Sequence, residues 1–238
     1  MDRLTATPPM LSAIPFFQAL DQTALADLAP RFQVENHRRG ADLAGRGFQR
    51  LDAYEDTVYF VSRGVVALYT ITKTNSRKIV FFLGPGRLLN HNVLGTRPNT
   101  LFAEVISDAI LLSIPRVEFS ALVQAHPALT RALLTCYETD LWRMSHQLKN
   151  TAGYLPVERK LAIKLGKLAQ EFGRPSPHGT ALSFPLTITQ MADFVGVPRE
   201  TASRACKRLG ELGLVRYENR RFAIPDRERL ALYCRSGQ

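Results

Sequence analysis

A small residue followed by a glycine four positions later constrains the C-terminal third of the chain more than any other feature. Ala192 allows two helices to cross closely, and Gly196 can adopt the positive φ that a turn between them needs. Pro198 suits the first turn of the next helix, where its missing N–H is not required. Thr187 and Gln190 have the spacing of a capping box at the start of the first helix. The pattern predicts a helix-turn-helix.

The second helix of this motif is expected over residues 198–211, with two faces of different character. Ala202, Ala205 and Leu209 fall on one face and can pack into a core. The opposite face carries groups that can read bases, since an arginine fork fits guanine O6 and N7 and a glutamate accepts from cytosine N4. The candidate base-reading residues are Arg199, Glu200, Ser203 and Arg204. The candidate phosphate contacts are Thr201, Lys207, Arg208, Arg220 and Arg221.

The residues after this helix and the local charge favour the same interpretation. Residues 214–217 and 221–224 are expected to pair as a β-hairpin, which would make the motif winged. Residues 151–238 contain 15 basic and 8 acidic residues, so this segment carries +7 of the net charge of +10 of the whole chain. A basic segment suits a polyanionic partner, so we predict binding of double-stranded DNA. Taken alone, the charged helix face could equally be a solvated surface.

The first half of the chain has a different residue pattern, typical of β-strands. Short runs rich in β-branched and aromatic residues are separated by turn residues, a pattern typical of a β-barrel or sandwich. The predicted strands are 57–61, 65–71, 78–82, 102–106 and 109–114.

A long helix is expected to begin at Pro127, and its apolar residues recur at alternating steps of three and four. Such a repeat is the seam of a coiled coil. The seam consists of Leu134, Tyr137, Leu141, Met144 and Leu148, followed by Thr151 and Leu155. We expect a partner helix from a second subunit to cover it, with packing on the chain's own β domain as the alternative.

These patterns predict an α+β chain with three parts. Residues 1–126 form an N-terminal β-barrel or sandwich. Residues 127–155 form the dimerisation helix and a hinge, and residues 156–238 form a winged helix-turn-helix. Within the last part, residues 158–172 are expected to be helical and residues 173–179 to be a loop.

The chain resembles the CRP/FNR family of transcription regulators over roughly residues 15–230. The resemblance rests on the order of these parts and on Val195-Gly196-Val197-Pro198-Arg199-Glu200-Thr201, with Ser203-Arg204 following. The resemblance implies that residues 1–126 form a β-roll, a jelly roll like those that bind cyclic nucleotides. Ser62-Arg63-Gly64-Val65 and Gly84-Pro85-Gly86 look like glycine turns of this β-roll. The resemblance implies a homodimer on a palindromic site, which recruits RNA polymerase or represses when the site overlaps a promoter.

The cyclic-nucleotide signature of that family is absent. Its nucleotide binders carry a Gly-Glu pair for the ribose and an Arg-Ser or Arg-Thr pair for the phosphate. The matching stretches here are Asn90-His91 and Asn99-Thr100, and Ser145 lies near the family's effector contacts. Without a guanidinium at Asn99, burial of the phosphate charge would be uncompensated. We therefore expect no cyclic AMP binding and leave the effector unknown or absent.

The cysteines favour no metal centre. Cys136, Cys206 and Cys234 are widely spaced, which supports neither a zinc ribbon nor an iron–sulfur cluster, and the family's oxygen sensors use N-terminal cysteines. We predict no cofactor. Haem is left open as an alternative, although the sequence has no diagnostic haem motif. The candidate haem ligands are His37, His91, His126 and Cys136. Oxidation of Cys206, two residues after Arg204, could block DNA binding, although a small packed residue is the simpler interpretation.

Other functional classes have less support. The sequence shows no Ser/His/Asp set, phosphate-cradling glycine loop or metal-ligand cluster, so an enzyme is not expected. The alternative is a small-molecule or haem sensor whose basic C-terminal domain serves a protein partner. No apolar run is long enough for a bilayer and no signal-peptide pattern is present, so we expect a cytoplasmic protein without a membrane partner.

Overall fold

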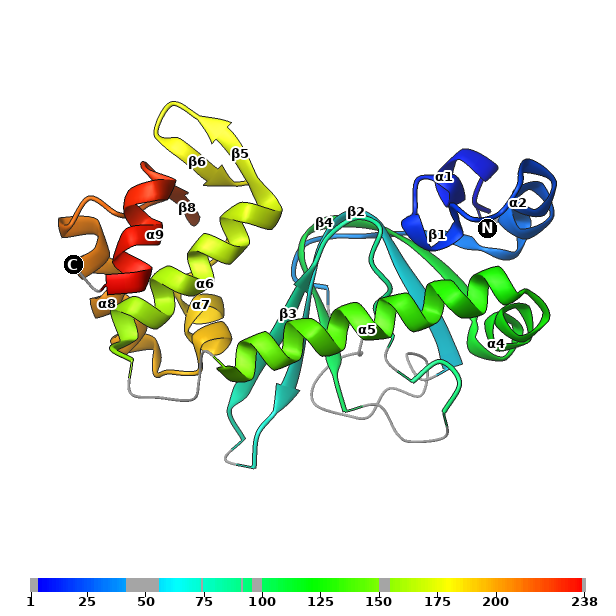
Figure 1. Ribbon diagram of the computed structural model, residues 1–238, viewed down its shortest axis with the longest axis horizontal. Coiled ribbons are helices and arrows are strands. Elements are labelled where there is room, and N and C mark those ends of the chain that lie inside the picture. The colour runs from blue at the N-terminus through cyan, green and yellow to red at the C-terminus, as the bar shows by residue number, and fades with distance from the viewer. Residues whose placement is uncertain are drawn as a thin grey trace. The chain divides into compact units, whose positions relative to one another are not determined.

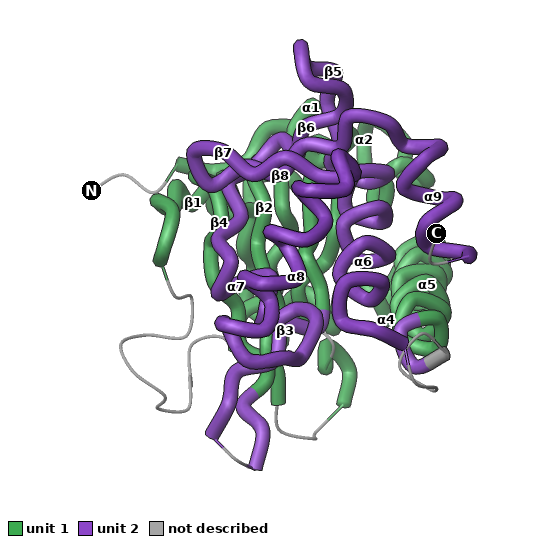
Figure 2. Tube along the Cα trace, turned by 90° about the vertical axis from the view of Figure 1, so that its left-hand side faces the viewer, with its two compact units in different colours: residues 1–70, 81–146 green, residues 71–80, 147–238 purple. Residues whose placement is uncertain are grey.

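The computed structural model describes residues 4–41, 56–73, 75–90, 92–95, 100–149 and 155–236. The chain divides into two compact units (Figure 2): unit 1 comprises residues 1–70 and 81–146, and unit 2 comprises residues 71–80 and 147–238. Most of the long helix therefore groups with unit 1. The division falls near the end of this helix, whereas the sequence predicted boundaries at residues 126 and 155.

The described part of unit 1 contains an antiparallel sheet with short helices at the N-terminus (Figure 1). Its sheet order is β1-β4-β2-β3, and β4 pairs antiparallel with both β1 and β2. The strands are β1 (Gln33–His37), β2 (Thr57–Ile71), β3 (Arg77–Leu83) and β4 (Phe102–Pro115). The helices are α1 (Pro8–Ser12), α2 (Gln22–Leu28), α4 (Arg116–Ala125) and α5 (Pro127–Lys149), with 3-10 turns at Pro15–Phe17 and Ala29–Arg31.

Two pairs of predicted short strands each form one longer strand, and Gly64 explains the first case, the joining of 57–61 and 65–71 into β2. We expected a turn there, but Gly64 lies inside β2 at φ +89°, where the register with β4 shifts between Val61 and Val66. A Cβ at Gly64 would lie 2.5 Å from the carbonyl oxygen of Asp108 on β4. The glycine thus allows a bulge and a close approach of two backbones, which bends the strand without ending it. The runs 102–106 and 109–114 likewise form one strand, β4.

Aromatic side chains fill the core of unit 1. Phe16, Phe17 and Phe32 from the N-terminal segment meet Phe60 of β2 and Phe119 of α4, all at most 4% exposed. The ring centroids of Phe17 and Phe60 are 5.0 Å apart, and those of Phe60 and Phe119 are 5.6 Å apart. Tilted and edge-to-face contacts at these separations are favourable for aromatic pairs, so the N-terminal segment is part of the core.

Unit 2 is a winged helix-turn-helix with a four-stranded sheet in the order β5-β6-β8-β7. Its helix α6 (Val157–Phe172) packs against the three other helices that the structure describes in this unit (Figure 1). These are α7 (Ile188–Val195), α8 (Arg199–Glu211) and α9 (Arg227–Ser236). The strands are β5 (Gly173–Ser176), β6 (Gly179–Leu182), β7 (Arg216–Glu218) and β8 (Arg221–Ile224).

Two features of unit 2 differ from the prediction. The predicted loop at residues 173–179 is largely a hairpin of β5 and β6, stabilised because β6 also pairs with β8. The C-terminal helix α9 was not predicted. It begins at an N-cap, Asp226, whose carboxylate accepts from the backbone N–H of Glu228 and Arg229.

In the part of the chain that the structure describes, no helix combines the length and apolar character needed to cross a bilayer.

Candidate DNA interface

The helix-turn-helix is built by the residues that the sequence pattern singled out. Thr187 caps α7: its Oγ1 accepts from the N–H of Gln190 at 3.1 Å, and Gln190 Oε1 accepts from the N–H of Thr187 at 3.0 Å. Gly196 ends α7 in the left-handed region at φ +85°, where a side chain would be strained. Ala192 is buried at the helix crossing. Pro198 directly precedes α8, so the helix begins at Arg199 and not at residue 198.

The two faces of α8 are separated as the sequence predicted. Ala202, Ala205 and Leu209 are fully buried against the rest of unit 2. All four candidate base-reading residues are exposed: Arg199, Glu200, Ser203 and Arg204. The helix therefore presents hydrogen-bonding side chains on a face that its own domain does not cover.

The charged residues of α8 are weakly restrained in the free protein. Arg199 Nη1 lies 3.9 Å from Glu200 Oε1, with both side chains at least 66% exposed. Arg208 pairs at 3.3 Å with Glu211, which lies three residues later on the same helix. Exposed pairs of this kind contribute little to stability, so these side chains can reorient toward a ligand at small cost.

The candidate phosphate contacts lie on α8 and at the wing. Lys207 and Arg208 are exposed, whereas Thr201 is half-buried and contributes to packing. Arg220 and Arg221 are exposed at the hairpin of β7 and β8, whose turn has Asn219 and Arg220 at positive φ. Two successive positive φ values match the twist of a tight hairpin, which holds these arginines at the tip.

The sequence patterns missed a further cation of the wing. Arg216 on β7 is exposed, and its Nη1 lies 3.0 Å from Nδ1 of His178 in the turn between β5 and β6. Pairing of β6 with β8 and of β8 with β7 brings these two residues together from 38 positions apart. Sequence spacing carries no signal for such a contact.

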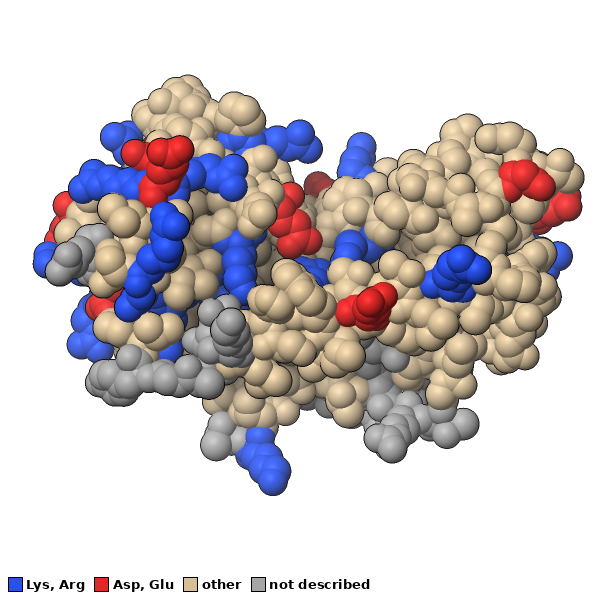
Figure 3. All heavy atoms as spheres, viewed as in Figure 1, with Lys and Arg blue, Asp and Glu red and all other residues tan. Residues whose placement is uncertain are grey.

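Basic side chains gather over unit 2 on the face seen in Figure 3, with fewer over unit 1. The view agrees with the uneven distribution of charge along the sequence. A surface of this kind attracts polyanions by a field that does not depend on base sequence.

Cys206 has the environment of a packing residue. Burial raises the pKa of its thiol to about 11, so the reactive thiolate is scarce near neutral pH. The burial of Cys206 therefore favours a small packing residue over an oxidation switch.

Of the predicted effector residues, the structure describes Asn90, Thr100 and Ser145. Asn90 is 1% exposed, and its amide is used by β2: Oδ1 accepts from the N–H of Tyr59 and Nδ2 donates to the carbonyl of Thr57. Thr100 is exposed, and Ser145 on α5 donates to the carbonyl of Leu141. His91 and Asn99 lie outside the described residues. Asn90 thus has a structural role that its sequence position did not reveal.

Two of the four candidate haem ligands, His37 and Cys136, have other contacts. His37 Nε2 lies 2.9 Å from a carboxylate oxygen of Glu35 on the same strand. Cys136 packs against the core of unit 1, and burial raises the pKa of its thiol. Within the described ranges, no group of three or more His, Cys, Asp or Glu side chains could hold a metal ion.

The seam residues of α5 divide into two sets. Leu134, Leu141, Met144 and Leu148 are between 45% and 68% exposed. Tyr137 instead packs against the core of unit 1, and its Oη accepts from the N–H of Val93 at 3.3 Å. Tyr137 is half-buried within its own unit, and its place in the seam stays a prediction. Leu155 lies beyond the end of α5 at Lys149, and Thr151 lies outside the described residues.

Family models match both halves of the chain. A cyclic nucleotide-binding domain matches residues 48–126, and a Crp-like helix-turn-helix domain matches residues 159–233. A protein of Rhizobium leguminosarum bv. viciae named "Probable transcriptional activator" is 30% identical over 176 residues, covering 71% of this chain and 70% of that protein. A "CRP-like cAMP-activated global transcriptional regulator" of Mycobacterium tuberculosis is 24% identical, covering 95% of this chain and 99% of that protein.

Solved structures share the fold at lower identity. FixK2 from Bradyrhizobium japonicum has a TM-score of 0.68 at 21% identity, covering 84% of this chain and 96% of that one. The c-di-GMP-responsive regulator CLP of Xanthomonas campestris has a TM-score of 0.72 at 18% identity, covering 87% of this chain and all of that one. Because the two domain models, the relatives and the fold agree, the chain belongs to the CRP/FNR family of transcription regulators.

Proposed function

We propose that the protein binds a palindromic DNA site as a homodimer and places α8 of each subunit in the major groove. The observation that carries this proposal is the open face of α8, where Arg199, Glu200, Ser203 and Arg204 are exposed opposite three fully buried residues. Arginine and glutamate side chains distinguish guanine and cytosine in the major groove. Lys207, Arg208 and the wing arginines supply contacts to the phosphates on either side.

The apolar stripe of α5 supports the dimer. Five of the ten large apolar side chains that are exposed in the described part of the chain lie on this one helix. Leu134, Leu141 and Leu148 are spaced by seven residues, which places them on one face. Trp142 and Met144 extend the stripe to either side. An exposed patch of this kind marks an interface, and a second copy of α5 presents the matching surface.

We further propose that the dimer acts through RNA polymerase. It recruits the polymerase when its site lies upstream of a promoter, or excludes it when the two sites overlap. Transcription in vitro from templates carrying the selected site at either position distinguishes these outcomes. Equal transcript yield with and without the protein on both templates would reject this part of the proposal.

Selection of binding sites from a random duplex pool tests the function directly. We expect enrichment of one inverted repeat, with half-site centres about one helical turn apart. Affinity for the selected duplex should fall steeply with salt and exceed that for random DNA. A pool that stays random, or binding insensitive to salt, would contradict the proposal. Running the selection with and without cell extract shows whether a ligand or a modification is needed.

Two alanine variants separate base reading from phosphate contact. Arg204→Ala should relax discrimination at one base pair in each half-site and cost about 1–3 kcal/mol on the matched site. Lys207→Ala should weaken binding to matched and mismatched duplexes alike and make the salt dependence shallower. Fluorescence anisotropy on a set of single-mismatch duplexes measures both effects. If the two variants behave identically on every duplex, the assignment of α8 as the reading helix is wrong.

We propose that operator binding does not depend on cyclic AMP. The phosphate-binding guanidinium of the family's nucleotide binders is replaced by Asn99, and the amide of Asn90 is already bonded to β2. An unpaired phosphate charge would be costly to bury. Operator affinity should therefore be the same with and without saturating cyclic AMP. A tenfold or greater increase, about 1.4 kcal/mol, would show that other residues replace the missing arginine.

A further inference from the structure

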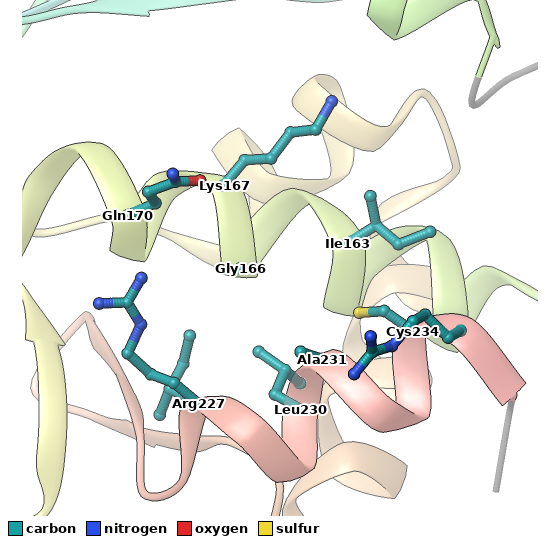
Figure 4. A pocket seen from close by; sticks show the side chains of 10 residues that line it. Ile163, Gly166, Lys167, Gln170, Arg227, Leu230, Ala231 and Cys234 are labelled. Carbon is teal, nitrogen blue, oxygen red and sulfur yellow. The ribbon is translucent and has the colours of Figure 1, made fainter.

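A groove of about 370 Å³ lies between α6 and α9 (Figure 4). It is within unit 2, and none of the residues assigned to DNA lines it. Its apolar lining comes from Ile163 of α6, Ile224 at the end of β8, and Leu230 and Ala231 of α9. Grooves of this volume are at the small end of those that hold organic ligands in proteins.

Gly166 lines the groove from α6 without a side chain. It lies inside α6, where glycine is about 1 kcal/mol less favourable than alanine. An added Cβ would meet only Cδ2 of Leu230 at 3.8 Å, an ordinary packing distance. Neither the backbone nor the packing therefore requires glycine here. The residue reduces helix stability, and the space above Leu230 remains free.

The charged side chains of the groove are cationic. Arg227 and Arg235 stand eight residues apart on α9, and Lys167 lies on α6 at the edge of the groove. In Figure 4 the side chain of Arg227 extends toward Gln170 on α6, whereas Lys167 points away from α9. No acidic residue among those described lines the groove. The adjacent Asp226 caps α9, so its carboxylate is engaged by backbone N–H groups.

We propose that this groove binds an amphipathic carboxylate, with its hydrocarbon part between α6 and α9 and its carboxylate on Arg227. The apolar lining and the cations define the ligand class because each recognises one half of such a molecule. Arginine binds a carboxylate through paired, charge-assisted hydrogen bonds, and the Gln170 amide adds a further donor. The hydrocarbon gains affinity by covering Leu230 and Ile224. This site is independent of the proposed function, since its residues are separate from those assigned to DNA.

Titration calorimetry on the full-length protein tests the proposal with three probes. Octanoate carries both recognised halves, octan-1-ol carries only the chain, and acetate carries only the charge. We expect octanoate to bind saturably below its micellar concentration, octan-1-ol to bind at least about tenfold more weakly, and acetate to show no binding. Absence of octanoate binding, or equal affinity for octanoate and octan-1-ol, would overturn the proposal.

Three variants place the ligand in the groove. Gly166→Leu fills the space and should weaken octanoate binding at least about tenfold, while Gly166→Ala, the matched control, should keep most of the affinity. Arg227→Gln should reduce octanoate affinity to that of octan-1-ol and leave octan-1-ol unchanged. Arg227 is exposed, so this variant tests the site even if Gly166→Leu does not fold. Octanoate affinity that is the same in Arg227→Gln as in the parent protein would refute the site.

Discussion

Replacing Leu141 with aspartate is expected to convert the protein to a monomer and to lower operator affinity by about a hundredfold or more. Leu141 is 67% exposed at the centre of the apolar stripe on α5, with Leu134 and Leu148 seven residues away on either side. In a parallel dimer, two aspartates would face each other in an apolar interface, where unpaired charges are strongly unfavourable. A monomer presents one reading helix, so it loses the affinity gained from two linked half-sites.

Sedimentation velocity and operator titration measure the two effects separately. Val117→Asp is the matched control, because Val117 is 82% exposed on α4 of the same unit and lies off the stripe. The control should remain dimeric and bind the operator like the parent. A Leu141→Asp protein that sediments as a dimer would rule out this stripe as the dimer interface.

Replacing Lys164 with methionine is expected to stabilise the protein at acidic and neutral pH and to reduce the dependence of its stability on pH. Lys164 is 9% exposed on α6, where its Nζ donates to Gln147 Oε1 at 3.0 Å and lies 4.1 Å from the ring centroid of Phe194. Burial, and secondarily the charges of Lys78 and Lys167, lower the pKa of Lys164 to about 7. The aromatic contact favours the charged form, but desolvation outweighs it.

The pH window follows from the two protonation states. An unfolded lysine titrates near its usual pKa of 10.5, so between pH 7 and that value the unfolded chain binds more protons than the folded one. The free energy of unfolding therefore rises with pH across this window. Below it, both states are charged and the folded protein bears the full cost of the buried ammonium. The lowered pKa corresponds to about 5 kcal/mol, so we expect Lys164→Met to be about 4 kcal/mol more stable at about pH 6, after about 1 kcal/mol for the lost hydrogen bond.

Urea unfolding between about pH 6 and pH 10 should show this gain shrinking as pH rises. Lys207→Met, on the exposed face of α8, is the control and should track the parent throughout. Burial also lowers the pKa of Lys78, so part of the slope will persist in both proteins. A constant difference between Lys164→Met and the parent across the range would mean that Lys164 stays charged in the folded protein up to about pH 10, contrary to the lowered pKa.

Local patterns predicted the elements whose residues have their own structural preference. The capping box at Thr187 and the positive φ at Gly196 act within one turn of the chain, so they were readable without any partner. Predictions were wrong where pairing with a segment distant in sequence determines the local structure. Gly64 is a turn residue by type, but pairing of β2 with β4 makes it a bulge within a strand. Residues 173–179 look like a loop until β6 pairs with β8.

The same distinction applies to the candidate sites. The exposed face of α8 follows from the helical period, because three buried residues fix the direction of the other side chains. Asn90, Tyr137 and the pair of Arg216 with His178 depend on contacts across the fold. Each has a polar group whose partner lies on another element, and sequence spacing does not carry that information.

The sequence alone determined the order of the parts, the helix-turn-helix and the chemistry that it presents to DNA. These properties arise from periodicity, caps and turn residues, which act over a few residues. Only the tertiary structure decided which of the apolar residues on α5 stay exposed, which lysine is buried, and that α6 and α9 leave a groove beside Gly166. Burial and cavities are properties of surfaces that meet in space, so they emerge only when the elements pack.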